Sequence, residues 1–226
     1  MPFVFLAGFA LVIALIIGAI IYGYIANKKR MEALGALAAQ NGLRFQEGRG
    51  AATLNYDVFE QGDNRYAENT LTGTWKDRPV QMGDFHYETQ STDSKGNRTT
   101  THHHFSYCHL LIANARFQGL FIRPEGFFDK LTALVGFDDI DFESAEFSKK
   151  FYVKSPDRKF AYDIVSPRMM EFLLARPWFT IYISDFGILV LAGSGTWSAE
   201  EFASRADFAT EFLGLIPDYV WEQWRA

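Results

Sequence analysis

The chain has 226 residues and a formal net charge of −5, and no side chain among residues 1–26 is charged. The excess of acidic groups therefore lies in the remaining ~200 residues, a length that suits one domain with a substantial core. Since phosphate binding needs a basic face, this charge balance argues against a nucleic-acid partner. Cys108 is the single cysteine, which excludes an internal disulfide and favours a reducing compartment.

The N-terminal segment Phe3–Ala26 is apolar throughout, with the sequence FVFLAGFALVIALIIGAIIYGYIA. Its length is enough to cross about 30 Å of hydrocarbon as a helix. Interfacial tyrosines lie at its end and a basic cluster follows at once. The residues that define this predicted membrane anchor are Phe3, Leu11, Ile16, Ile21, Tyr22, Tyr24, Lys28, Lys29 and Arg30.

The order of charge and apolar run predicts the orientation of the anchor. A cleaved signal peptide has its basic residues before a shorter apolar core, whereas here they follow a long one. By the positive-inside rule, Lys28, Lys29 and Arg30 place the C-terminal domain in the cytoplasm. We therefore expect a single-pass protein of the cytoplasmic membrane.

Three segments are predicted along the chain: a transmembrane anchor (1–27), a juxtamembrane helix and linker (28–58), and a soluble α+β domain (59–226). Met31–Gln40 continues the helix until Asn41-Gly42 stops it, and Leu43–Glu47 is a short strand. Further strands are predicted over Arg65–Trp75, Val80–Thr89, Thr100–Asn114, Gly119–Arg123 and Phe147–Lys154. A helix is predicted from Pro124 to Val135, and others over Asp157–Ile164 and Arg168–Ala175.

The C-terminal part is predicted to contain a hairpin of Trp178–Ser184 with Gly187–Ala192, whose turn is Asp185-Phe186-Gly187. Ser198 and Glu201 have capping-box spacing for a helix that runs to Leu213. Tight hairpin spacing argues for an antiparallel sheet rather than for βαβ units. The predicted fold class is therefore α+β: an N-terminal transmembrane helix followed by a mostly antiparallel sheet with packed helices.

Two of the predicted strands concentrate the histidines of the chain: His86, His102, His103, His104 and His109. Pairing these strands as a hairpin with Phe85 opposite Phe105 places Phe85, Phe105 and Tyr107 on one buried face. The other face then carries two cross-strand pairs, His86 with His104 and Glu88 with His102. Cys108 lies too far along the strand to join them.

This polar face is a candidate metal site. Cross-strand neighbours lie about 5 Å apart, so His86, Glu88, His102 and His104 could hold one divalent ion such as Zn²⁺. Zn²⁺ is the one cofactor that the sequence suggests. Two other interpretations stay open: a pH sensor, because imidazole titrates near neutrality, and an exposed polar surface on which histidine is merely tolerated.

Other short patterns favour structural roles. Asp185-Phe186-Gly187 lacks the glycine-rich loop and the lysine of a kinase, so a hairpin turn explains it better. The acidic residues from Asp138 to Glu146 lack calcium-loop spacing and indicate a solvated turn. For the C-terminal Trp221 and Trp224 we expect docking on the sheet rather than insertion at a membrane surface, because the tail has little basic character.

Three stretches resemble a family of small bacterial membrane-anchored proteins when taken with the anchor: FEQGDNRYAENTLTGTW, the Val80–Tyr87 strand, and FSKKFYVKSPDRKFAYDIVSPRMMEFL. The family shares a loose F…F.V.S.D…A…L segment before a closing hairpin. The resemblance implies a bacterial source, and the family is uncharacterised, with no established activity to transfer. The histidine run is not part of the resemblance.

The sequence supports three hypotheses of function and contains no catalytic signature. The first is a membrane-anchored accessory or scaffold protein in a larger bacterial membrane assembly, with a membrane-protein partner or a second copy. The second is a metal-dependent enzyme or a metal or pH sensor on the histidine face. The third is a lipid or small-molecule pocket in a curved sheet, suggested by the 22 phenylalanines.

Overall fold

The computed structural model describes residues 2–50, 54–125, 139–176 and 179–226, with side chains from residue 11 onward. The helices are α1 (Pro2–Gln40), α2 (Ala145–Lys150), α3 (Arg158–Ile164), α4 (Pro167–Leu174), α5 (Ala199–Leu215), α6 (Asp218–Gln223) and the short 3₁₀ helix η1 (Asp57–Glu60). The strands are β1 (Arg44–Gly50), β2 (Asp63–Trp75), β3 (Arg78–Thr92), β4 (Arg98–Leu111), β5 (Leu120–Pro124), β6 (Phe151–Lys154), β7 (Thr180–Ser184) and β8 (Gly187–Leu191).

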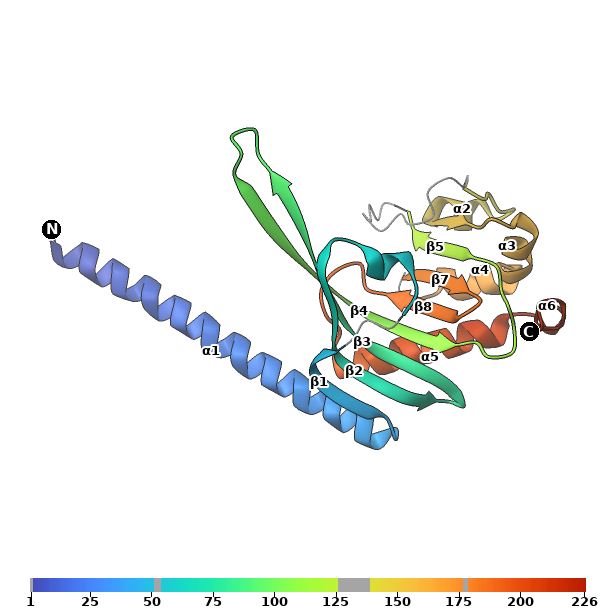
Figure 1. The fold of residues 1–226 in the computed structure, drawn as a ribbon, viewed down its shortest axis with the longest axis horizontal. Coiled ribbons are helices and arrows are strands. Elements are labelled where there is room, and N and C mark those ends of the chain that lie inside the picture. The colour runs from blue at the N-terminus through green and yellow to red at the C-terminus, as the bar shows by residue number, and fades with distance from the viewer. Residues whose placement is uncertain (1, 51–53, 126–138, 177–178) are drawn as a thin grey trace.

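Helix α1 is continuous from the apolar segment into the folded domain (Figure 1). Its apolar side chains from Leu11 to Ile25 are exposed, whereas Met31, Leu34 and Ala38 are buried in the core. In the described part of the chain, this is the one helix long and apolar enough to cross a membrane, by length and composition. The helix ends where predicted, because Gly42 adopts a φ of 65° and the Leu43 amide donates to the Ala38 carbonyl at 2.8 Å.

The strands form one antiparallel sheet in the order β1-β2-β3-β4-β8-β7-β5-β6, which confirms the predicted α+β class. The predicted register of the central hairpin is also confirmed: Phe85 pairs with Phe105, Tyr87 with His103, His86 with His104, and Glu88 with His102. Residues of the range 28–58 belong to the same folded unit, because α1 packs on β1 and β1 pairs with β2.

Successive residues of β3 and β4 face opposite sides of the sheet. One face is aromatic: Phe85, Phe105 and Tyr107 are buried, and Phe59 of η1 packs on them, with its ring 4.8 Å from that of Phe85. The other face carries the end of α1 and helix α5 (Figure 1). This second face, the helix face, contains Asp84 and His86.

Strands β3 and β4 extend beyond the sheet as a two-stranded ribbon. The last pair between β2 and β3 is Asp63 with Glu88, so within the described residues the two strands pair only with each other farther out. We call residues 89–101 the arm. The arm leaves the body toward the same side as the N-terminal half of α1 (Figure 1). Its side chains from Gln90 to Thr101 are polar, apart from Gly96, and exposed.

Two predicted elements differ from the structure. Pro124 ends strand β5, where it pairs with Phe151, instead of opening a helix; a strand end accommodates its missing N–H. The rest of that predicted helix lies outside the described residues. The predicted strand Phe147–Lys154 is helix α2 followed by β6, because Ser144 caps a helix by accepting the Phe147 amide at 3.2 Å.

The C-terminal tryptophans pack on the domain, but against rings of the segment before β5 and of α3 rather than on the sheet that was expected. The ring of Trp221 lies 4.8 Å from that of Phe117, and the ring of Trp224 lies 5.5 Å from that of Phe160. The predicted capping box is present as well, because Ser198 and Glu201 cap α5, and Ser166 caps α4. The tryptophan contacts lie at the end of the molecule that carries α6, opposite α1 (Figure 1).

Candidate functional site

A row of six polar side chains follows β3 and β4 on the helix face. Alternation along β3 places Asp84, His86 and Glu88 on this face, and the register adds their partners on β4. The three cross-strand pairs are Asp84 with Ser106, His86 with His104, and Glu88 with His102. The row therefore leads from the part of α1 that packs on the domain to the base of the arm.

The first pair of the row contacts the apolar helix α1. The two terminal nitrogens of Arg30 donate to the two carboxylate oxygens of Asp84, each at 2.8 Å. The Arg30 Nε also donates to the Trp197 carbonyl at 2.8 Å. The Asp84 side chain is 1% exposed and that of Arg30 is 17% exposed. Such a shielded two-bond contact fixes direction as well as position. We call it the clamp.

Further donors complete the surroundings of Asp84. Ser106 Oγ donates to Asp84 Oδ1 at 2.6 Å, and Asn69 Nδ2 donates to Oδ2 at 3.2 Å. Ser106 Oγ in turn accepts the Trp197 amide at 2.8 Å. Asn69 has a φ of 52° and lies where the register of β2 shifts, so a bulge presents its side chain. The clamp therefore joins α1, three strands and the segment before α5.

Arg30 has a different place from the one predicted. The sequence grouped Arg30 with Lys28 and Lys29 at the membrane surface, but its side chain enters the domain, while both lysines stay exposed. Among the other anchor residues, Leu11, Ile16, Ile21, Tyr22 and Tyr24 are exposed on α1. Phe3 lies in α1 before the described side chains. The role of Asp84 was not predicted from the sequence; its signal is a carboxylate between the apolar residues Met82 and Phe85.

The other two pairs of the row form a histidine and carboxylate cluster. Glu88 Oε1 lies 3.4 Å from His86 Nε2 and 3.3 Å from His102 Nδ1. One potential ligand atom from each of the three residues lies within 4.8 Å of the other two. His86 is buried, Glu88 is half-buried and His102 is exposed. We call these three residues the triad.

Glu88 is held as a carboxylate. Asn64 Nδ2 donates to its Oε1 at 2.7 Å. This hydrogen bond makes the largest contribution to a pKa of Glu88 below its usual range. The hydrogen bond from His86 and the charge of His102 lower the pKa further. The ring of Tyr66 stacks on that of His86 with centroids 4.5 Å apart, which fixes the plane of the imidazole. The triad thus has one ionised oxygen donor between two ring nitrogens.

His104 contacts the triad from outside. Its Nε2 lies 3.2 Å from His86 Nδ1, and its Nδ1 lies 3.6 Å from Glu68 Oε1. Three of the four predicted ligands therefore converge. The fourth, His104, contacts His86 Nδ1, the ring nitrogen that points away from Glu88. His103 lies on the opposite face, where it stacks on Tyr87 at 4.5 Å and its Nε2 lies 2.8 Å from Thr89 Oγ1.

His109 and Cys108 are separate from the triad. Both are buried in β4, and burial raises the pKa of the Cys108 thiol. Burial also lowers the pKa of His109 to about 4, and its Nε2 has no hydrogen-bond partner in the structure. The His109 ring meets Tyr56 edge-on at 5.6 Å. His109 is therefore neutral at physiological pH and serves as a packing residue.

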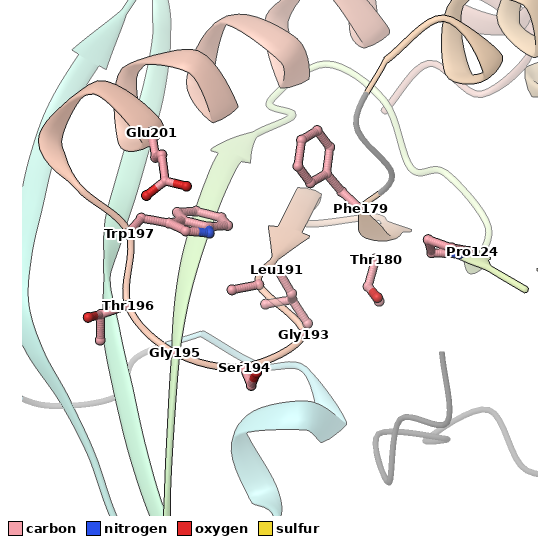
Figure 2. Close-up of a pocket in the computed structure, with 11 residues that line it drawn as sticks. Pro124, Phe179, Thr180, Leu191, Gly193, Ser194, Gly195, Thr196, Trp197 and Glu201 are labelled. Atoms are coloured by element: carbon pink, nitrogen blue, oxygen red, sulfur yellow. The ribbon is translucent and has the colours of Figure 1, made fainter. Parts of the chain in front are cut away.

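A surface hollow of about 270 Å³ lies beside the loop Gly193-Ser194-Gly195 (Figure 2). Among its lining residues that the structure describes, Glu201 is the charged one. Its carboxylate accepts the Ser198 amide at 2.8 Å and lies 3.7 Å from Arg205. Figure 2 shows Trp197 and Phe179 along the same hollow. The Glu201 carboxylate is thus already engaged by neighbouring groups.

The fold and the polar row together define an α+β domain carried on an apolar N-terminal helix. A search of solved structures finds similarity to the crystal structure of the mycobacterial trehalose monomycolate transport factor A, TtfA. The TM-score is 0.57 at 12% identity, and the match covers 82% of this chain and 90% of TtfA. At this identity the likeness shows the fold alone. No protein-family model and no curated protein matches the chain.

Proposed function

We propose that this chain is a membrane-anchored accessory protein of a bacterial inner-membrane assembly, with its domain on the cytoplasmic side. The observation that carries the proposal is the clamp. Arg30 lies only a few residues beyond the apolar run, and its contact with Asp84 fastens the membrane helix to the centre of the sheet. A domain held in this way keeps one orientation relative to the bilayer, as a docking module requires.

The similarity to TtfA supports the same class. That protein is described as a transport factor, and its chain shares the fold over most of its length. We infer that the present chain also serves a membrane transport or assembly process through a protein partner. Its anchor and its exposed Lys28 and Lys29 favour the cytoplasmic side.

The arm is the surface that suits the partner. Its polar side chains and its open strand edges are not compatible with hydrocarbon, which leaves backbone groups without partners. It nevertheless projects toward the side from which the membrane segment of α1 leaves the domain (Figure 1). A membrane protein beside α1 could bind the arm through strand pairing and polar contacts.

Orientation can be tested with a single introduced cysteine. Cys108 is fully buried, so Ser94→Cys at the exposed tip of the arm provides the reactive thiol. In intact spheroplasts we expect a membrane-impermeant maleimide to label this variant only after lysis. Labelling before lysis would place the domain outside the cytoplasm and contradict the proposal.

The partner can be tested by shortening the arm. Deleting Ser91, Thr92, Arg98 and Thr99 removes two cross-strand pairs and keeps the alternation of faces along both strands. We expect full-length protein extracted from native membranes to hold a stoichiometric partner that the shortened variant loses. The unfolding temperature should stay unchanged, because the removed residues are exposed.

A substitution at the far end of the molecule provides the matched control. Tyr219 on α6 is 52% exposed, and Tyr219→Ala should keep the partner. A lone monomer or dimer from the native membrane would contradict an accessory role. A partner that survives shortening of the arm would move the contact to another surface.

A further inference from the structure

We propose that the triad His86, Glu88 and His102 is a binding site for one divalent transition-metal ion of the Zn²⁺ class. The geometry supports this first. Three donor atoms lie within 4.8 Å of one another, close to the spacing of ligands around a single ion. Two imidazoles and a carboxylate are also a common ligand set of Zn²⁺ sites that keep a fourth position open.

The surroundings of His86 supply a second, independent argument. For His86 Nε2 to bind a metal ion, its Nδ1 must carry the proton. That proton then points to His104 Nε2, 3.2 Å away, and the His104 Nδ1 proton points to Glu68 Oε1 at 3.6 Å. A single choice of tautomers satisfies this whole chain. Metal-binding histidines characteristically have such a partner on the second nitrogen, often backed by a carboxylate.

Two of the three ligand side chains are also held in position by neighbouring residues before any ion binds. Stacking on Tyr66 sets the plane of the His86 ring, and the Asn64 amide positions the Glu88 carboxylate. His102 is exposed, so an ion can enter from solvent and the last ligand can close on it. Because His86 is two residues from Asp84 on the same face, the ion would lie between the clamp and the arm. Binding there would tie the base of the arm to the sheet.

This inference does not depend on the proposed function, because it concerns ligand chemistry alone. The test uses full-length protein in detergent, without a polyhistidine tag and after dialysis against a chelator. Zn²⁺ is titrated by calorimetry, and Co²⁺ by its visible absorption. We expect one equivalent of Zn²⁺ to bind with a dissociation constant below micromolar. Bound Co²⁺ should show the intense visible absorption that is typical of four- or five-coordinate Co²⁺.

Matched variants separate the triad from its neighbours. His102→Ala removes a direct ligand and Glu88→Gln replaces the carboxylate with a neutral amide, so each should weaken binding by about 100-fold or more. Glu68→Gln acts only through His104 and should weaken binding by less than about 10-fold. His103→Ala should change affinity less than about twofold, because His103 is the adjacent histidine on the opposite face. The metal-free variants should unfold at the wild-type temperature, apart from small shifts.

Two outcomes would overturn the proposal. Protein that takes up no Zn²⁺ at micromolar concentration would leave the cluster as a hydrogen-bonded polar surface. Equal affinity in wild-type, His102→Ala and Glu88→Gln protein would place the ion elsewhere. Neither outcome would affect the test of the arm, because that test reads partner retention and not metal.

Discussion

At the scale of single residues, the burial of His109 makes the stability of the fold depend on pH. Burial lowers its pKa from 6.5 to about 4, so the unfolded chain binds a proton there more readily than the folded protein does. The contribution of neutral His109 to the free energy of unfolding is therefore fully present above pH 6.5 and falls as the pH drops toward 4. At about 1.4 kcal/mol per pH unit, we expect a loss of about 2 kcal/mol between pH 7 and pH 5.

Denaturant unfolding at both pH values measures this loss. His109→Phe removes the titrating ring and should flatten the pH dependence by about the same 2 kcal/mol. The exposed His102 provides the control, and His102→Ala should leave most of the slope in place. A His109→Phe protein with the wild-type slope would show that the pH dependence comes from other groups.

At the scale of elements, the hairpin of β7 and β8 depends on Gly187. Its φ is 151°, and a methyl group there would overlap the Leu110 carbonyl oxygen and approach His109 Nε2 to 2.6 Å. We expect Gly187→Ala to lower the free energy of unfolding by at least about 1–3 kcal/mol from backbone strain alone. Gly214 in α5 is exposed with open space around it, so Gly214→Ala should instead add up to about 1 kcal/mol. Equal effects in denaturant unfolding would contradict this account.

Elements with a local signal were predictable, and elements decided by packing were not. The capping box of Ser198 and Glu201 follows from residues close in sequence, and the register of Phe85 with Phe105 follows from alternation. Phe147–Lys154 was predicted wrongly because alternating and four-residue spacing coexist there. The rings of Phe147 and Phe151, four residues apart, stack at 4.9 Å.

The same distinction between local signals and packing applies to the candidate site. The pairing of His86 with His104 follows from strand register, which a sequence pattern carries. The clamp does not, because 54 residues separate Arg30 from Asp84 and a basic cluster after an apolar run suggests a lipid contact first. Which histidines converge also depends on ring rotation, and this is why His104 lies outside the triad.

At the scale of the whole molecule, we expect the clamp to set the angle between the apolar helix α1 and the sheet. Asp84→Asn leaves the partly buried Arg30 guanidinium without its counter-charge, which we expect to cost about 3 kcal/mol. Spin labels on Leu11→Cys and Ser94→Cys report the angle, because Cys108 is buried and does not react. The distance distribution between helix and arm should be narrow in the otherwise wild-type protein and broad with Asp84→Asn.

An exposed ion pair supplies the control for charge removal. Arg176 Nη2 lies 2.6 Å from Glu211 Oε2, and Glu211→Gln makes the same chemical change at the surface. Its effect should stay within about 1 kcal/mol and leave the distance distribution narrow, because solvent screens such pairs. If Asp84→Asn also keeps a narrow distribution, the apolar contacts of Met31, Leu34 and Ala38 orient the helix. The clamp would then contribute stability without fixing the direction of α1 relative to the sheet.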